Sequence, residues 1–170
     1  MKEDFFPESG LLTLEEACAW REELRRQGRR LVVTNGCFDL LHRGHAAYLA
    51  AARREGEAML VLINSDASVR QLKGETRPVC DQESRAYVLC ALRSVDRVVI
   101  FDGQRCHQEL AALKPDVYVK GGDYTREKLD PGELAALDQA GSRIVFKPFI
   151  PGFSTTTLIQ RIAAGLEHGI

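Results

Sequence analysis

The most informative part of this 170-residue sequence is the segment Leu31-Val32-Val33-Thr34-Asn35-Gly36-Cys37-Phe38-Asp39-Leu40-Leu41-His42-Arg43-Gly44-His45. Its first four residues are apolar or β-branched, which is typical of a buried strand. Gly36 then allows the backbone to approach a ligand closely, and a helical pattern follows from Gly44. This order predicts a phosphate-binding turn, because the free amides and the dipole of a helix N-terminus attract anions.

His42 and His45 are the candidate catalytic residues in this segment. They stand three residues apart, so they project in similar directions from one helical turn. Gly44, between them, removes a side chain that would crowd a bound anion. Two imidazole donors at a helix start suit the charge that builds on a phosphate, whereas an acyl-transfer triad would also need a nucleophile. A structural hydrogen-bonding role and a metal site are the alternatives, although no third ligand stands at a zinc-like spacing.

Strands and helices alternate on both sides of this segment. Thr13 and Glu16 predict a capping box at the start of an N-terminal helix at about 13–28. Further strands are expected at 59–63, 97–101, 117–119 and 144–146. Further helices are expected at 44–54, 82–93, 104–113 and 131–140, with a last helix capped by Ser154.

This alternation predicts the fold class. Successive strand–helix units favour a parallel sheet with right-handed crossovers and helices on both faces. We therefore expect one Rossmann-like doubly wound α/β domain of about five strands over residues 13–170, preceded by a mobile tail at 1–12.

Composition excludes several classes of protein. Lys and Arg number 23 against 24 Asp and Glu, and the net charge of −1 argues against a nucleic-acid-binding surface. No apolar run reaches the roughly 20 residues of a membrane helix, and the acidic N-terminus is unlike a secretory signal. The five cysteines form an odd set without a C-x-x-C pair, which favours a reducing compartment over a disulfide framework or a zinc site. We expect a cytoplasmic protein with neither a membrane nor a nucleic acid as partner.

Ligands of doubly wound sheets bind outside the carboxyl ends of the strands, so we expect the site in the segments that follow the strands. In the segment 70–78, Lys73 and Arg77 stand in a predicted flexible basic loop that suits a lid over phosphates. A solvated loop with scattered charge is the alternative, and we favour it for Arg70. Arg85 either clamps a phosphate or pairs with Asp81 on a helix surface.

Two later segments are also candidates. Gly121 and Gly122 at a strand end would let the backbone approach a nucleotide, or they form only a tight turn. Ser154, Thr155 and Thr156 open the last helix, where three hydroxyls and free amides suit a phosphate site. A simple N-cap at Ser154 is the alternative.

Together these segments resemble a known family. Residues 35–45 are similar to the signature of the cytidylyltransferase-like nucleotidyltransferases, which transfer a nucleotidyl group from a nucleoside triphosphate and release pyrophosphate. The motifs that narrow the resemblance to the D-glycero-β-D-manno-heptose 1-phosphate adenylyltransferases are Asn64-Ser65-Asp66, Leu72-Lys73-Gly74, Arg77-Pro78, Val119-Lys120-Gly121-Gly122-Asp123-Tyr124 and Gly152-Phe153-Ser154-Thr155-Thr156. The resemblance runs from about Leu11 to Ile162. Phe149-Ile150-Pro151 stand where related glycerol- and choline-phosphate cytidylyltransferases carry an arginine–threonine pair, which fits the heptose branch.

The resemblance implies transfer of AMP from ATP to a heptose 1-phosphate, giving ADP-heptose for lipopolysaccharide or other surface glycans. It implies that His42, His45 and Lys73 are catalytic. The nucleotide site it implies consists of Gly36, Cys37, Phe38, Gly44, Gly121, Gly122, Asp123, Ser154, Thr155 and Thr156. The acceptor site it implies consists of Asn35, Asp39, Asn64, Arg77 and Arg85, with Asp39 orienting either the histidines or the acceptor.

The resemblance also bears on partners. Mg²⁺ would arrive with ATP, since no carboxylate cluster suggests a metal cage. Family members commonly associate, so a homodimer or larger homo-oligomer is expected, with the helix at 13–27 as a possible interface. The chain has no room for a fused kinase, so a separate sugar kinase would supply its substrate. The alternatives are a glycerol-3-phosphate cytidylyltransferase, a flavin-nucleotide adenylyltransferase or a non-catalytic nucleotide-binding module.

Overall fold

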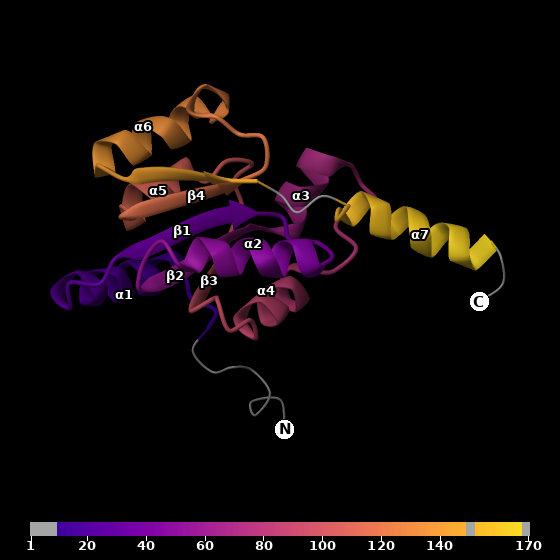
Figure 1. The fold of residues 1–170 in the computed structure, drawn as a ribbon, viewed down its shortest axis with the longest axis horizontal. Helices are drawn as coiled ribbons and strands as arrows, with labels where there is room; N and C mark the ends of the chain where they lie inside the picture. Colours follow the sequence, from indigo (N-terminus) through magenta and orange to yellow (C-terminus); the bar gives the residue numbers. More distant parts are fainter. Residues whose placement is uncertain (1–9, 149–151, 168–170) are drawn as a thin grey trace.

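A parallel sheet forms the centre of the structure, a computed structural model that describes residues 10–148 and 152–167 (Figure 1). Its strands are β1 (Leu31–Gly36), β2 (Ala58–Asn64), β3 (Arg97–Phe101), β4 (Val117–Gly121) and β5 (Arg143–Lys147). Their order is β3-β2-β1-β4-β5, and all neighbouring strands run parallel. In β1, Val32 aligns with Met59 on one side and with Val117 on the other. The order of the strands therefore reverses between β1 and β4, which is the point where such sheets bind ligands.

Helices cover both faces of this sheet (Figure 1). The helices are α1 (Leu14–Arg26), α2 (Arg43–Arg53), α3 (Asp66–Lys73), α4 (Gln82–Cys90), α5 (His107–Leu113), α6 (Pro131–Ala140) and α7 (Thr155–Glu167), with a short 3₁₀ helix at Arg126–Lys128. Of these, α7 extends away from the sheet (Figure 1). Leu31 and Val33 of β1 face a core shared with α1, α5 and α6, whereas Val32 faces a core shared with α2 and α4. This alternation is the period of two that a strand buried on both faces requires. The doubly wound α/β fold predicted from the sequence is confirmed.

Two helices are shorter than the sequence predicted. The helix predicted at 82–93 ends at Cys90, where a tight turn follows. The helix predicted at 104–113 begins only at His107, with Cys106 as its N-cap, and the Cys106 amide donates to a carboxylate oxygen of Glu133 at 3.2 Å. The capping box at the start of α1 is present as predicted. None of the helices in the described ranges has the length and apolar character needed to span a bilayer.

The first residues of the described chain do not behave as a tail. The amide of Val98 in β3 donates to the Gly10 carbonyl at 2.8 Å, and the Leu12 amide donates to the Val98 carbonyl at 2.9 Å. The prediction of a mobile tail is therefore wrong for residues 10–12, and residues 1–9 lie outside the described ranges.

Helix α3 was not predicted. The hydroxyl of Ser65 caps it by accepting from the Ser68 amide at 3.3 Å, and Gly74 ends it with φ +94°. Arg70 and Lys73 therefore lie on a helix, and the predicted flexible loop begins only after them. The short length of α3 and the glycine that follows made its pattern resemble a loop.

Candidate functional site

Two cavities share a wall at the carboxyl ends of β1 and β4. The larger has a volume of about 320 Å³ and the smaller about 210 Å³. Both are lined by His45, Lys73, Arg77 and Thr155. The larger is also lined by Asn35, Gly36, Cys37, Phe38, Asp39, Tyr48, Lys120, Gly121 and Tyr124, and the smaller by His42, Gly44, Phe153, Ser154 and Thr156. Side chains from four separate segments of the sequence thus meet where the strand order reverses.

His42 stands at the N-terminus of α2 as its capping residue. Its Nδ1 accepts from the Gly44 amide at 3.1 Å, so the proton of the neutral ring lies on Nε2. The rings of His42 and His45 stack with centroids 3.9 Å apart. A Cβ at Gly44 would lie 2.9 Å from Cε1 of His42 and 3.0 Å from Cβ of Phe153. Glycine is therefore needed here to make room for these two side chains, whereas the sequence suggested room for an anion.

Both imidazoles are neutral at pH 7. Burial and the neighbouring His42 lower the pKa of His45 from 6.5 to about 4, and burial also lowers the pKa of His42. Neutral rings avoid the cost of burying two cations side by side, and each still provides one N–H donor. His42 can therefore donate from Nε2 to a phosphate oxygen without carrying charge, and His45 can do so only from Nε2, because its Nδ1 is buried.

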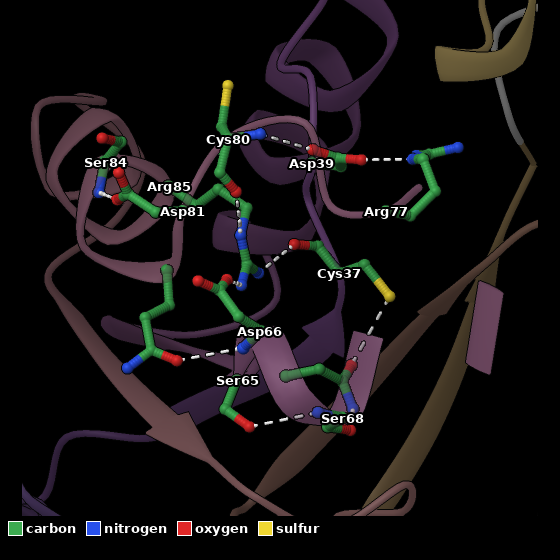
Figure 2. A network of polar contacts seen from close by, with 12 residues as sticks. Cys37, Asp39, Ser65, Asp66, Ser68, Arg77, Cys80, Asp81, Ser84 and Arg85 are labelled. Carbon is green, nitrogen blue, oxygen red and sulfur yellow. Dashed lines mark hydrogen bonds and ion pairs between the residues drawn. The ribbon is translucent and has the colours of Figure 1, made fainter. Parts of the chain in front are cut away.

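Asp39 holds the segment that carries Arg77 (Figure 2). Its carboxylate accepts from Nε of Arg77 at 2.5 Å and from the amides of Val79 and Cys80 at 2.7 and 3.1 Å. Burial alone would raise the pKa of Asp39, but these hydrogen bonds together lower it. Asp39 thus fixes the position of Arg77 beside the cavities, and its interaction with the acceptor stays a prediction.

Arg85 is a structural residue (Figure 2). Its side chain is 0% exposed and donates to the carbonyls of Cys80 and Cys37 at 3.0 and 2.7 Å. Its third contact is an ion pair with Asp66 at 2.8 Å, whereas one of the two alternatives from the sequence was a pairing with Asp81. These contacts hold the guanidinium in the interior, and it lines neither cavity, so its role in acceptor binding stays a prediction.

Asn64 is likewise held in the interior. It is 3% exposed, and its amide donates to the Ser68 hydroxyl at 2.9 Å and to the Gly103 carbonyl at 3.2 Å. Its Oδ1 accepts from the thiol of Cys37 at 3.7 Å. Asn64 therefore joins β2 to α3 and lines neither cavity, and its place in the acceptor site stays a prediction.

Gly122 and Asp123 lie beyond the lining of the cavities. Gly122 takes φ +102° and donates its amide to the Lys147 carbonyl at 2.9 Å, which extends the pairing of β4 with β5 by one bond. Asp123 is exposed, and its backbone carbonyl accepts from Lys128 at 3.0 Å. Their roles in nucleotide binding stay predictions.

Sequence reasoning missed Tyr48 and Phe153, which also line the cavities. Tyr48 stands three residues after His45 on α2, so helical spacing could have found it. Its buried hydroxyl donates to the Val119 carbonyl at 3.0 Å and joins α2 to β4. Phe153 lies within a non-helical segment, where no periodic pattern indicates where its ring will lie.

The residues that line the cavities do not fit a metal ion held by the protein. Across the described ranges, no three His, Cys, Asp or Glu side chains gather as a metal site. Asp39 supplies the carboxylate at the cavities, and it is occupied by Arg77 and two backbone amides. A divalent cation would therefore need its ligands from a bound substrate.

Comparison with known proteins identifies relatives of this chain. The family model described as Cytidylyltransferase-like matches residues 33–161. The chain is 49% identical over 143 residues to "Bifunctional protein HldE" of Rhodopseudomonas palustris (strain BisA53), covering 84% of this chain and 29% of that protein. It is 46% identical over 159 residues to the protein of the same name from Methylococcus capsulatus, covering 94% of this chain and 33% of that protein. The chain thus spans about a third or less of the length of these curated relatives.

Solved structures agree with this result. The crystal structure of the lipopolysaccharide core biosynthesis protein from Thermoplasma volcanium GSS1 superposes with a TM-score of 0.58 at 27% identity, covering 72% of this chain and 98% of that one. Pantoate-beta-alanine ligase from Francisella tularensis, with a TM-score of 0.51 at 13% identity over 82% of this chain and 66% of that one, shows the shared fold alone. Since the family match extends from β1 into α7 and includes the residues shared by both cavities, the chain belongs to the cytidylyltransferase-like family.

Proposed function

We propose that this protein is an adenylyltransferase that transfers AMP from ATP to a heptose 1-phosphate and releases pyrophosphate and ADP-heptose. The observation that carries the proposal is the pair of cavities joined through His45, Lys73 and Arg77. Two substrates that react with each other need two sites with a common boundary, and cationic and neutral donors at that boundary suit reacting phosphates. The identity to proteins named HldE and to a lipopolysaccharide core biosynthesis protein supports a heptose phosphate as the acceptor.

The smaller cavity suits the triphosphate of ATP. Nε2 of His42, an N–H of His45 and the hydroxyls at the start of α7 are donors at its wall. The hydroxyl of Ser154 also accepts from the Thr157 amide at 3.0 Å, so it caps α7 while lining the cavity. Lys73 adds positive charge where the two cavities meet.

The reaction needs positioning more than acid–base chemistry. An oxygen of the acceptor phosphate attacks the α-phosphorus of ATP, a new P–O bond forms, and the bond to the bridging oxygen of the β-phosphate breaks. The attacking oxygen is already anionic, so no side chain has to remove a proton and no covalent enzyme intermediate is needed. His42, His45 and Lys73 would stabilise the charge that develops on the α- and β-phosphates and on the leaving pyrophosphate.

The substrates of the proposed reaction indicate which metal ion and which preceding enzyme it needs. Mg²⁺ would enter bound to ATP as part of the substrate, since the lining residues do not form a cage for it. The acceptor must arrive phosphorylated at its anomeric carbon, so we propose that a sugar kinase acts before this protein. We also propose a cytoplasmic location and a homo-oligomeric state, for which size-exclusion chromatography with light scattering is the direct measurement.

The test is a matrix of nucleotides and acceptors. ATP and CTP are each combined with heptose 1-phosphate, glycerol 3-phosphate and flavin mononucleotide, and pyrophosphate release is measured with mass spectrometry of the product. We expect turnover with ATP and heptose 1-phosphate and the mass of an ADP-heptose. Faster turnover with CTP and glycerol 3-phosphate, or with flavin mononucleotide, would assign another transferase activity, and nucleotide binding without pyrophosphate from any pair would indicate a binding module.

A further inference from the structure

Three polar side chains meet at the wall of the larger cavity, between β1 and β4. Asn35 ends β1, and Tyr118 and Lys120 point to the same face of β4 as alternate residues. Oδ1 of Asn35 lies 2.6 Å from Nζ of Lys120 and 2.7 Å from the hydroxyl of Tyr118. Nζ of Lys120 also lies 3.2 Å from the Tyr118 hydroxyl. The carboxamide of Asn35 therefore accepts two hydrogen bonds through one oxygen.

These contacts determine which way the carboxamide faces. An ammonium group has only donors, so the atom of Asn35 beside Lys120 has to be the oxygen. Burial raises the pKa of Tyr118, so its hydroxyl keeps its proton and can donate as well. The Nδ2 group, with two N–H donors, is turned away from Lys120 and has no hydrogen-bond partner within the described part of the chain. Asn35 lines the larger cavity, so a ligand in that cavity is the available acceptor.

Lys120 is itself held firmly. Its side chain is 13% exposed and lies 4.0 Å from the carboxylate of Glu133, which is 2% exposed. The ring of Tyr124 covers the ammonium with its centroid 5.2 Å away. Glu133 in turn accepts from the Cys106 amide at 3.2 Å. A chain of contacts thus runs from the start of α6 through Lys120 to Asn35 and prevents the carboxamide from turning over.

We propose that Asn35 is a specificity-determining residue whose amide donates to a hydroxyl oxygen of a sugar ring in the larger cavity, and that Lys120 is the positioning residue that fixes this polarity. This inference rests on the proposed function, which supplies two sugars with such oxygens, the acceptor heptose and the ribose of ATP. Because the amide can only donate, a ligand group that can only donate is rejected, whereas a hydroxyl oxygen is accepted.

Asn35→Asp is the decisive variant. An aspartate keeps the oxygen that Lys120 and Tyr118 contact and adds an ion pair with Lys120, so the fold and the thermal midpoint should be preserved. It replaces the two N–H donors with an acceptor oxygen that faces the ligand oxygen. We expect the KM for one sugar substrate to rise about tenfold or more, which corresponds to the loss of about one hydrogen bond, with a smaller change in kcat. Gln27→Glu, which makes the same amide-to-acid change on the exposed end of α1, should leave both constants at the wild-type values.

The KM values for the two substrates show which sugar supplies the hydroxyl oxygen. A rise in KM for heptose 1-phosphate alone assigns the amide to the acceptor, and a rise in KM for ATP alone assigns it to the ribose. Either result supports the inference. Lys120→Met, which frees the carboxamide to rotate, should raise the KM for the same substrate by a smaller factor, and this variant carries the test if Asn35→Asp does not fold.

Calorimetric titration measures the binding of each substrate without turnover, so it tests the role of Asn35 separately from the proposed reaction. Wild-type protein that binds a sugar phosphate or ATP without turnover would overturn the proposed reaction alone. Equal affinities of the wild type and Asn35→Asp for both ligands would overturn the role of the amide, whatever the turnover. If the aspartate variant does not fold, an unchanged affinity of Lys120→Met for both ligands would overturn the role of the amide.

Discussion

At the scale of single residues, the stacked imidazoles of His42 and His45 are the proposed donors to the reacting phosphates. His45 lines both cavities, and its neutral ring can direct an N–H to oxygens at their boundary. Replacing His45 by alanine should lower kcat by about 10²–10³, the usual effect of removing one preorganised donor to a developing charge. Steady-state pyrophosphate release measures this loss, and circular dichroism confirms that the variant folds.

The matched control for this variant is His107→Ala. His107 is exposed on α5 and lines neither cavity, so its loss should leave turnover unchanged. Near-wild-type turnover of His45→Ala would remove the ring from the mechanism. His42→Ala is less informative, because it also removes the N-cap of α2, which costs about 1 kcal/mol of stability.

The lowered pKa of His45 also links stability to pH. The pKa is about 4 in the folded protein and 6.5 for an ordinary imidazole, so between these values the unfolded chain binds a proton that the folded protein does not. The free energy of unfolding should therefore fall as the pH falls from about 6.5 to 4. Urea unfolding at pH 7 and pH 5 should show a larger loss for the wild type than for His45→Gln, and equal losses would contradict the shift.

At the scale of elements, buried Arg85 connects three segments that shape the site. It ties α4 to α3 through Asp66 and to the histidine-containing loop through the Cys37 carbonyl. Arg85→Met removes these contacts and leaves Asp66 without its counter-charge, so it should cost about 3 kcal/mol of unfolding free energy. Denaturant unfolding measures the loss, and kcat/KM should fall as well, because Lys73 stands on α3.

Two further variants make this prediction specific. Adding Asp66→Asn to Arg85→Met removes the unpaired charge and should restore part of the stability. Arg70→Met changes an exposed arginine of the same helix α3 and should shift stability by less than about 0.5 kcal/mol. An Arg85→Met variant as stable as the wild type would show that the network in Figure 2 contributes nothing.

The turn after β1 and the burial of Arg85 show which features could be predicted from the sequence and which could not. The turn after β1 could be predicted because its signals are local: an apolar strand, glycines and two histidines three residues apart. The burial of Arg85 could not, because it depends on Asp66, which is distant in sequence and reaches Arg85 only after α3 and α4 pack against β2. The contacts of Asn64 could not be predicted for the same reason, since its partners Ser68 and Gly103 belong to different segments.

At the scale of the whole molecule, we expect the amino end of the sheet to contribute to stability and the carboxyl end, where the cavities lie, to bind substrates. Asp116 lies at the amino end of β4, where it accepts from the Leu31 amide at 2.7 Å and pairs with buried Arg21 of α1 at 2.8 Å. Asp116→Ala leaves the Leu31 amide without its acceptor and leaves Arg21 with the Lys114 carbonyl but no counter-charge, so it should cost about 2 kcal/mol of unfolding free energy. The KM values for both substrates should stay unchanged, because the cavities open at the opposite end of the sheet.

A surface pair provides the control for this variant. Asp138→Ala breaks an exposed ion pair with Arg126 and should change stability by no more than about 0.5 kcal/mol. A large rise in KM for Asp116→Ala would contradict the separation of the two ends of the sheet. Kinetics and urea unfolding on the same preparations give both readouts.

The parallel sheet has a consequence for how the protein folds during its synthesis. Parallel neighbours cannot be joined by a short hairpin, so every pairing waits for a crossover to close. The central strand β1 is synthesised first, yet Val32 has to wait for Val117 before its second edge is covered. Domains fold as the chain emerges from its N-terminus, and distant pairings are slow because loop closure costs entropy before the contacts form. The wall formed by Asn35 and Lys120 is therefore among the last parts to assemble, and a nascent chain exposes one edge of β1 until β4 is made.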